Sequence, residues 1–164
     1  MKKTRVMLSI ISVIVIGLLV TSSAYAKKYE IDRFGTKSCT GSVGGNNDTR
    51  YGVRNRNHGI TLIIKAIRVY DADANLVYDS SSDGFIGGIK TVLPPLNSTA
   101  FWLSDLITAG SGSWGSGPGI MEIDWRAGGT SIGLPLSAGG FRRVTDGSGN
   151  ILSERPQNCR EIPL

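Results

Sequence analysis

Glycine-rich turns cut most of this chain into short apolar segments, and this pattern constrains the fold more than any other feature. Of the 22 glycines, 21 lie after residue 26, and glycine costs conformational entropy inside regular structure. No segment after residue 26 shows a sustained helical period. Strands of roughly 4–8 residues tolerate such frequent interruption, whereas helices need about 10 or more. The chain after residue 26 is therefore predicted to be rich in β-strands.

The predicted strands are short and separated by turn residues. They cover residues 51–54, 60–70, 76–78, 85–93, 99–103, 120–126, 141–144 and 151–152, while residues 27–48 read as a polar lead-in. Hairpins are expected around the turns 71–75 and 146–150, which are rich in Asp, Asn and Gly. This spacing predicts an antiparallel β-sandwich, immunoglobulin-like in the loose sense. A small β-barrel is the alternative.

Two of these strands carry a more specific pattern. Met121, Ile123 and Trp125 alternate with charged residues, so one face of that strand is expected in the core. In residues 60–70 the apolar positions change from even to odd numbers near Lys65. Side chains in a strand point to alternate faces, so this change predicts a β-bulge or bend.

Residues 1–26 have the composition of a cleavable secretory signal. A basic start is followed by an apolar run from Met7 to Val20, and the segment ends in Ala24-Tyr25-Ala26. A retained membrane anchor is the alternative, but the run of about 14 residues is shorter than the ~20 that a spanning helix needs. Residues 27–164 are therefore expected to form a single exported domain, periplasmic or secreted, with no membrane span.

The charge of the predicted mature chain argues against a nucleic-acid partner. Residues 1–26 hold three of the 18 Lys and Arg residues and none of the 13 acidic ones, so the remaining chain is only weakly basic. Its close basic pairs are Arg54/Arg56 and Arg142/Arg143. Neutralising a phosphate backbone requires a concentrated basic face, and the sequence shows none.

The two cysteines, Cys39 and Cys159, lie near opposite ends of the predicted mature chain. In an oxidising compartment such a pair is expected to form a disulfide. A free thiol pair and a metal site are the alternatives. A metal site would need further ligands, and His58 is the only histidine in the sequence.

Several short motifs between Gly52 and Trp125 occur in a fixed order. They are Arg54-Asn55, Tyr70-Asp71, the segment from Leu93 to Phe101, a Gly/Ser loop at 112–117, and Glu122 with Trp125. This series resembles a family of bacterial exported proteins and lipoproteins of unknown function. The chain departs from the family in the second proline of Pro94-Pro95, in Trp114, and in lacking a lipid-anchor cysteine. The resemblance implies an extracytoplasmic β-domain and supplies no particular activity.

One acidic turn has part of a calcium-binding pattern. Asp71, Asp73 and Asn75 place oxygen ligands at the first, third and fifth positions of a calcium loop. Leu76 stands where that loop needs glycine, and Ser82 stands where it needs glutamate. Asp79 could add an oxygen to an irregular site. The alternative is a hairpin turn without metal, because Asp and Asn side chains accept local backbone hydrogen bonds.

Trp114 is the predicted ligand contact. It lies in the middle of the Gly/Ser loop 110–119. An aromatic side chain on such a loop can contact a sugar ring or a partner surface, because it offers a large area with few torsions to fix. The alternative is that the loop folds back and packs the indole over the sheet.

The sequence favours a binding protein over an enzyme. His58 lies in a turn composition, without the positioned nucleophile that a general base needs. Glu122 and Asp124 share the outer face of one strand, about 7 Å apart at Cα, as on a solvated surface. We therefore expect a non-enzymatic domain that binds a protein or a cell-envelope polymer, without a cofactor. A calcium-stabilised structural module and an envelope-polymer hydrolase are the alternatives.

Overall fold

Antiparallel strands make up most of the described chain. The computed structural model describes residues 34–128 and 134–163, within which it has nine strands and one helix. In chain order these are β1 (Phe34–Ser42), β2 (Asn47–Arg54), β3 (Thr61–Tyr70), β4 (Leu76–Asp79), β5 (Val92–Leu93), β6 (Ser98–Trp102), α2 (Leu103–Ala109), β7 (Pro118–Gly128), β8 (Ser137–Thr145) and β9 (Ile151–Ile162). All paired strands are antiparallel, which confirms the predicted all-β class.

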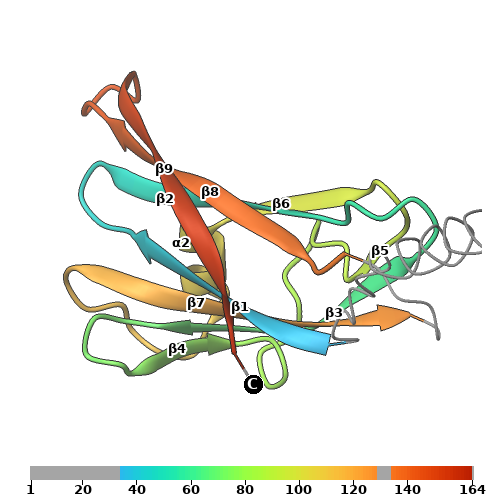
Figure 1. Cartoon of the computed structure of the whole chain (residues 1–164). Helices are drawn as coiled ribbons and strands as arrows, with labels where there is room; N and C mark the ends of the chain where they lie inside the picture. The colour runs from blue at the N-terminus through green and yellow to red at the C-terminus, as the bar shows by residue number, and fades with distance from the viewer. Residues whose placement is uncertain (1–33, 129–133, 164) are drawn as a thin grey trace, which may run out of the picture. The chain divides into compact units, whose positions relative to one another are not determined.

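The strands form one curled sheet, so the prediction of a two-sheet sandwich is wrong. Hydrogen bonding is continuous in the order β4-β3-β7-β1-β9-β8-β2-β6, with β5 added to β3. The strand β9 makes this possible, because it pairs with β8 over residues 151–158 and with β1 over residues 159–162. The path ends at β4 and β6 without closing, so the sheet is a half-barrel and not the small barrel of the alternative prediction (Figure 1).

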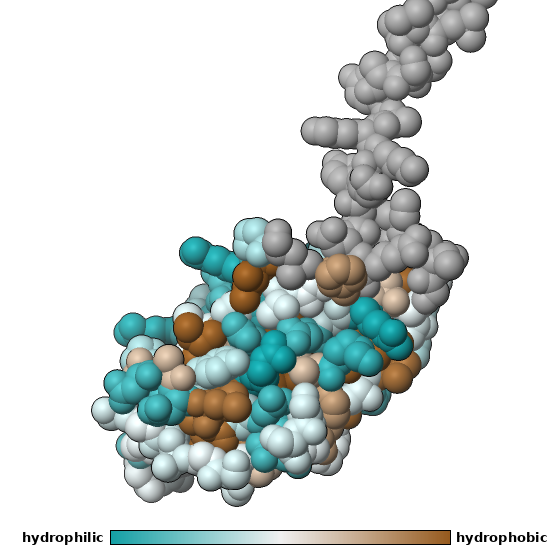
Figure 2. Space-filling view, turned by 90° about the horizontal axis from the view of Figure 1, so that it is seen from below, coloured by the Kyte–Doolittle hydropathy of each residue, from teal (hydrophilic) through white to brown (hydrophobic). Residues whose placement is uncertain are grey.

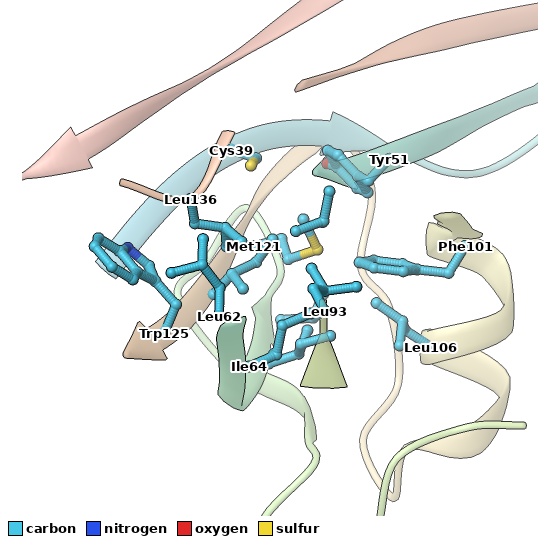
Figure 3. Close-up of a cluster of buried hydrophobic side chains, with 14 of the residues drawn as sticks. Cys39, Tyr51, Leu62, Ile64, Leu93, Phe101, Leu106, Met121, Trp125 and Leu136 are labelled. Carbon is cyan, nitrogen blue, oxygen red and sulfur yellow. The ribbon is translucent and has the colours of Figure 1, made fainter. Parts of the chain in front are cut away.

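The hydrophobic core lies inside the curl of the sheet. Figure 3 shows side chains from both halves meeting there, with Tyr51 and Phe101 on one side and Leu62 and Met121 on the other. The helix α2 follows β6 directly and buries Leu103 and Leu106 in the same core. In the described part of the chain, no helix has the length and apolar character needed to cross a membrane.

The predicted bulge in the long strand is confirmed. The register of β3 against β7 shifts between Ile64 and Ala66, on either side of Lys65. Ile64 and Ile67 are both buried, although they would face opposite sides of a regular strand. The extra residue lets the apolar side chains before the bulge (Leu62 and Ile64) and after it (Ile67 and Val69) all point toward the core.

Three local predictions are wrong. Residues 34–42 form strand β1 and not a polar lead-in; its inward positions include Gly35, Cys39 and Gly41, too small to give an apolar alternation. Their small size leaves room for Trp125, which packs beside Gly35, and for Tyr51, which packs beside Gly41.

The helix α2 is the second difference from the prediction. It was missed because its seven residues hold too few positions to show a helical period. Of the predicted strand 85–93, only β5 pairs with a neighbour.

A buried amide pair holds the loops at one end of the sheet. The Asn55 amide nitrogen donates to the carbonyl oxygens of Ile60 and Leu93, at 2.6 and 2.8 Å. Its oxygen accepts hydrogen bonds from the backbone and side-chain nitrogens of Asn57, and the Asn57 side chain bonds the backbone of Leu134. Both asparagines are buried. Replacing either would leave backbone groups unpaired away from water.

Two hairpin turns, 71–75 and 146–150, use the same hydrogen-bond pattern. In each, the first aspartate accepts hydrogen bonds from the backbone N–H groups two and four residues on, and from the side chain of the closing asparagine. The fourth residue has a positive φ, 63° at Ala74 and 85° at Gly149. The left-handed conformation is strained for alanine and natural for glycine.

The predicted disulfide between Cys39 and Cys159 is present and joins β1 to β9 at directly opposed positions. The two Cα atoms lie 4.2 Å apart, close to the ~4.5 Å of a non-hydrogen-bonded antiparallel pair. Cys39 is buried, and Cys159 packs against the core. The bond therefore fastens the two halves of the sheet where β9 passes between them.

We predict that losing this bond lowers the free energy of unfolding by about 4–5 kcal/mol in the chain-entropy model, because it spans a sequence separation of 120. Urea unfolding with and without dithiothreitol measures this loss. The control is the double variant C39A/C159A, whose unfolding midpoint should not respond to the reductant. Equal midpoints for the oxidised and reduced wild-type chain would contradict the prediction.

The twin turns give a matched pair of substitutions. Ala74→Gly should raise the free energy of unfolding by about 0.5–1 kcal/mol, because it relieves the left-handed strain. Gly149→Ala should lower it by a similar or larger amount. Urea unfolding of both variants under one condition tests the pair. A lower midpoint for Ala74→Gly would show that the strain at this turn is not significant.

Candidate functional site

Four polar loops gather at one end of the half-barrel (Figure 1). They connect β1 to β2, β3 to β4, α2 to β7, and β8 to β9. The strand register brings them together, since Ser42 pairs with Pro118, Tyr70 with Ile120, and Asn47 with Val144. Loops held at one end of a rigid sheet are a common position for binding residues.

A groove of about 770 Å³ opens between two of these loops and β8. We call it the Trp114 groove. Its lining consists of Ser42, Val43, Gly44, Gly45, Asn47, Trp114, Gly115, Ser116, Gly117, Pro118 and Arg142. The glycines leave much of the wall to backbone atoms, so the larger side chains that shape the groove are Trp114 and Arg142.

The indole of Trp114 is half-buried and folds back onto the core, as the alternative interpretation of the sequence expected, while its role as a ligand contact stays a prediction. One side packs against the core and covers Gly119, where a Cβ atom would collide with the six-membered ring. The other part lines the groove. The absence of a side chain at Gly119 thus creates the seat in which the indole rests. Because that seat fixes the ring, a ligand would meet a preorganised aromatic surface.

Three polar atoms without hydrogen-bond partners belong to residues of this groove. They are Ser42 Oγ, Trp114 Nε1 and Arg142 Nε, and within residues 34–128 and 134–163 no other buried side-chain nitrogen or oxygen lacks a partner. The guanidinium of Arg142 is oriented by a 2.9 Å hydrogen bond from its Nη2 to Asn47 Oδ1. Unpaired buried polar groups are rare in folded proteins and call for an explanation.

The donor types define what the Trp114 groove can bind. The indole and guanidinium nitrogens only donate hydrogen bonds, and the serine hydroxyl can donate or accept. The chemical complement of these groups is a carbonyl, carboxylate or hydroxyl oxygen, and because all three atoms are buried, a ligand reaches them only when the lining side chains move. Ser42 and Arg142 were missed as site residues, because strands distant in the sequence bring them to the loop that carries Trp114.

The residues of the predicted calcium site form hairpin turns. Both carboxylate oxygens of Asp71 accept hydrogen bonds within its own turn, from the backbone of Asp73 and from the backbone and side chain of Asn75. Asp79 is the last residue of β4 and accepts a hydrogen bond from the backbone of Ser81. No group of three or more His, Cys, Asp or Glu side chains among the described residues is arranged to hold a metal ion. The calcium hypothesis remains a prediction.

The titratable residues His58, Glu122 and Asp124, which the sequence does not favour as catalytic groups, do not line the Trp114 groove. His58 is exposed in the loop between β2 and β3. On the outer face of the sheet, Arg68 pairs with Glu122 at 3.4 Å and with Asp124 at 2.7 Å. Thr36 also donates a hydrogen bond to Asp124. Figure 2, seen from below Figure 1, shows hydrophilic residues across the middle of the visible face with apolar residues between them.

Comparisons with protein-family models, curated proteins and solved structures gave no significant match to this chain. The resemblance to exported β-domains between Gly52 and Trp125 therefore remains a prediction. The predicted signal peptide, residues 1–26, lies outside the described residues. The disulfide indicates an oxidising environment, as expected for a domain outside the cytoplasm.

The turn aspartates should make stability depend on acid pH. The side chain and backbone of Asn75 donate hydrogen bonds that hold the pKa of Asp71 below its ordinary value, and Asn150 lowers the pKa of Asp146 in the same way. A carboxylate with a lowered pKa in the folded state stabilises the fold above its unfolded pKa, and this stabilisation is lost as the pH falls.

We therefore predict that the urea midpoint falls between about pH 5 and pH 2, as these carboxylates become protonated. The double variant D71N/D146N should show a shallower fall, because it cannot lose those charges. Urea unfolding across this pH range measures both chains. Identical pH profiles for the variant and the wild type would show that these turns do not contribute.

Proposed function

We propose that this chain is an exported, non-enzymatic binding module that takes an oxygen-rich segment of a cell-envelope polymer or protein in the Trp114 groove. The observation that carries the proposal is that three residues lining one groove, Ser42, Trp114 and Arg142, each hold a buried polar atom without a hydrogen-bond partner. Its predicted signal peptide, its disulfide and its resemblance to exported β-domains support a place outside the cytoplasm.

The energetics of the groove support ligand binding. Leaving a buried donor without a partner costs about 1–3 kcal/mol. A movement of the lining side chains that let a ligand oxygen reach such a donor would recover that free energy. The indole adds a rigid apolar surface on which a sugar ring or a peptide group can lie. Hydrogen-bond donors beside a fixed aromatic ring are a common arrangement at recognition sites.

The lining of the groove supports binding over hydrolysis. Its described residues include no carboxylate, histidine or cysteine. A hydrolase would need a group that exchanges a proton near neutral pH, beside a nucleophile or an activated water. Glu122 and Asp124 do not supply one to the groove, because they lie on the outer face and pair with Arg68.

Titration with soluble peptidoglycan fragments, followed by calorimetry, tests the proposal. We expect the disulfide-bonded chain to bind them, and Trp114→Ala to weaken binding at least about ten-fold, which corresponds to ~1.4 kcal/mol. Arg142→Gln should weaken it as well, because the substitution removes a donor. The matched control is Arg155→Gln, an arginine on β9 outside the groove lining.

Equal affinity of the Trp114→Ala variant would rule out this groove as the binding site. Failure of the peptidoglycan fragments and of a panel of envelope oligosaccharides and peptides would rule out the proposed ligand classes. A melting temperature that falls in EDTA and recovers with calcium would instead favour the calcium-stabilised structural module.

A further inference from the structure

The outer face of the β6-β2-β8-β9 part of the sheet has a strip without large side chains. Gly52 on β2 lies between Ala100 on β6 and Gly139 on β8, and Asn158 on β9 follows Gly139 in the same row. The strip crosses three strand spacings and is therefore about 14 Å long. We call it the glycine strip.

The fold itself does not require glycine at these two positions. Gly52 and Gly139 both have backbone φ angles open to any residue. A Cβ atom at Gly52 would have its nearest neighbour at 3.9 Å, and one at Gly139 at 3.7 Å, which are ordinary contacts. Glycine weakens a strand interior, and its presence there often marks a close approach by a ligand or another backbone. The bare surface is therefore a candidate contact area.

Arginine and aromatic side chains line the two sides of the glycine strip. Trp102, Arg50 and Phe141 form the neighbouring row on one side, and Arg54 stands on the other. Arg50, Gly52, Ala100, Gly139 and Phe141 help to enclose a shallow depression of about 310 Å³. Arg50 and Arg54 are four residues apart on one strand, so their Cα atoms are separated by about 13 Å.

The aromatic pair orients the arginines on its side. The Cζ atoms of Arg50 and Arg143 lie 5.6 and 4.9 Å from the centre of the Trp102 ring, within the range of cation–π attraction. Phe141 meets the same indole edge-to-face, with the ring centres 6.0 Å apart. Arg143 pairs with Glu154, but neither Arg50 nor Arg54 pairs with a carboxylate among the described residues. Two guanidinium groups are thus available to an anionic partner.

We propose that the glycine strip binds an acidic polysaccharide whose sugar rings carry carboxylates. A ring can lie against the bare backbone, while the planar guanidinium groups of Arg50 and Arg54 bind carboxylates on either side in the two-point geometry that suits them. This site is separate from the Trp114 groove and does not rest on the function proposed there.

Other occupants fit the surface less well. A nucleic acid carries closely spaced phosphates, whereas Asp48 and Glu154 stand beside Arg143 on this face and leave only a modest positive charge. An added peptide strand would pair along the open edge of β6, whereas the strip runs across the face of the sheet at right angles to the strands. A carboxylated glycan needs only a few cations and a flat floor.

The test uses the disulfide-bonded chain and two probes of equal length, hexagalacturonate and the uncharged maltohexaose. Calorimetry should show binding of the acidic probe that weakens as NaCl is raised, and no binding of the neutral one. Gly52→Val should weaken binding at least about ten-fold without lowering the unfolding midpoint, because valine favours a strand but fills the floor of the strip. Binding that survives Gly52→Val would overturn the proposal.

Arg54→Gln provides a second variant that leaves the sheet interior unchanged. It should reduce affinity for hexagalacturonate about ten-fold and flatten the salt dependence, whereas Arg155→Gln and Trp114→Ala should leave both unchanged. Equal binding of maltohexaose would overturn the proposal. Tighter binding of a single-stranded DNA, or dimerisation through this face in sedimentation, would also overturn it by assigning the strip to another partner.

Discussion

The passage of one long strand between the two halves of the sheet is the constraint on which the rest of this structure depends. The strand β9 pairs with β8 along most of its length and with β1 at its end. Without that second pairing, the described strands would separate into two sheets. The Cys39–Cys159 bond lies at this junction and packs against the core, so it fixes covalently the short pairing that joins the two halves of the sheet.

The curl creates three different surfaces from the same strands. Its interior takes the apolar side chains and α2, and one end collects the polar loops around Trp114. Its outer faces carry charges that pair across strands, as Arg68 does with Asp124 and Arg143 with Glu154. On the β6-β2-β8 side, two opposed glycines interrupt that charged surface. The proposed binding regions are therefore separated by the sheet and can be tested independently.

Glycines on the strands make the space in which three large aromatic side chains pack. Gly35 and Gly41 let Trp125 and Tyr51 pack beside the backbone of β1, and Gly119 forms the seat of Trp114. Buried polar side chains act in the same way at the other end, where Asn55 joins two loops through backbone carbonyl groups. Neither kind of residue contributes to an apolar pattern, so both are invisible to an argument from hydrophobic periodicity.

The sequence by itself determined the strand class, the bulge at Lys65, the two hairpin turns and the pairing of the cysteines. Each of these follows from residues close in the chain, or from chemistry that only two residues can share. Only the tertiary structure decided that β9 joins two halves into one sheet, that residues 34–42 form a strand, and that Ser42 and Arg142 reach Trp114. Those features depend on register between distant strands, which polar and glycine-rich segments do not encode in any local pattern.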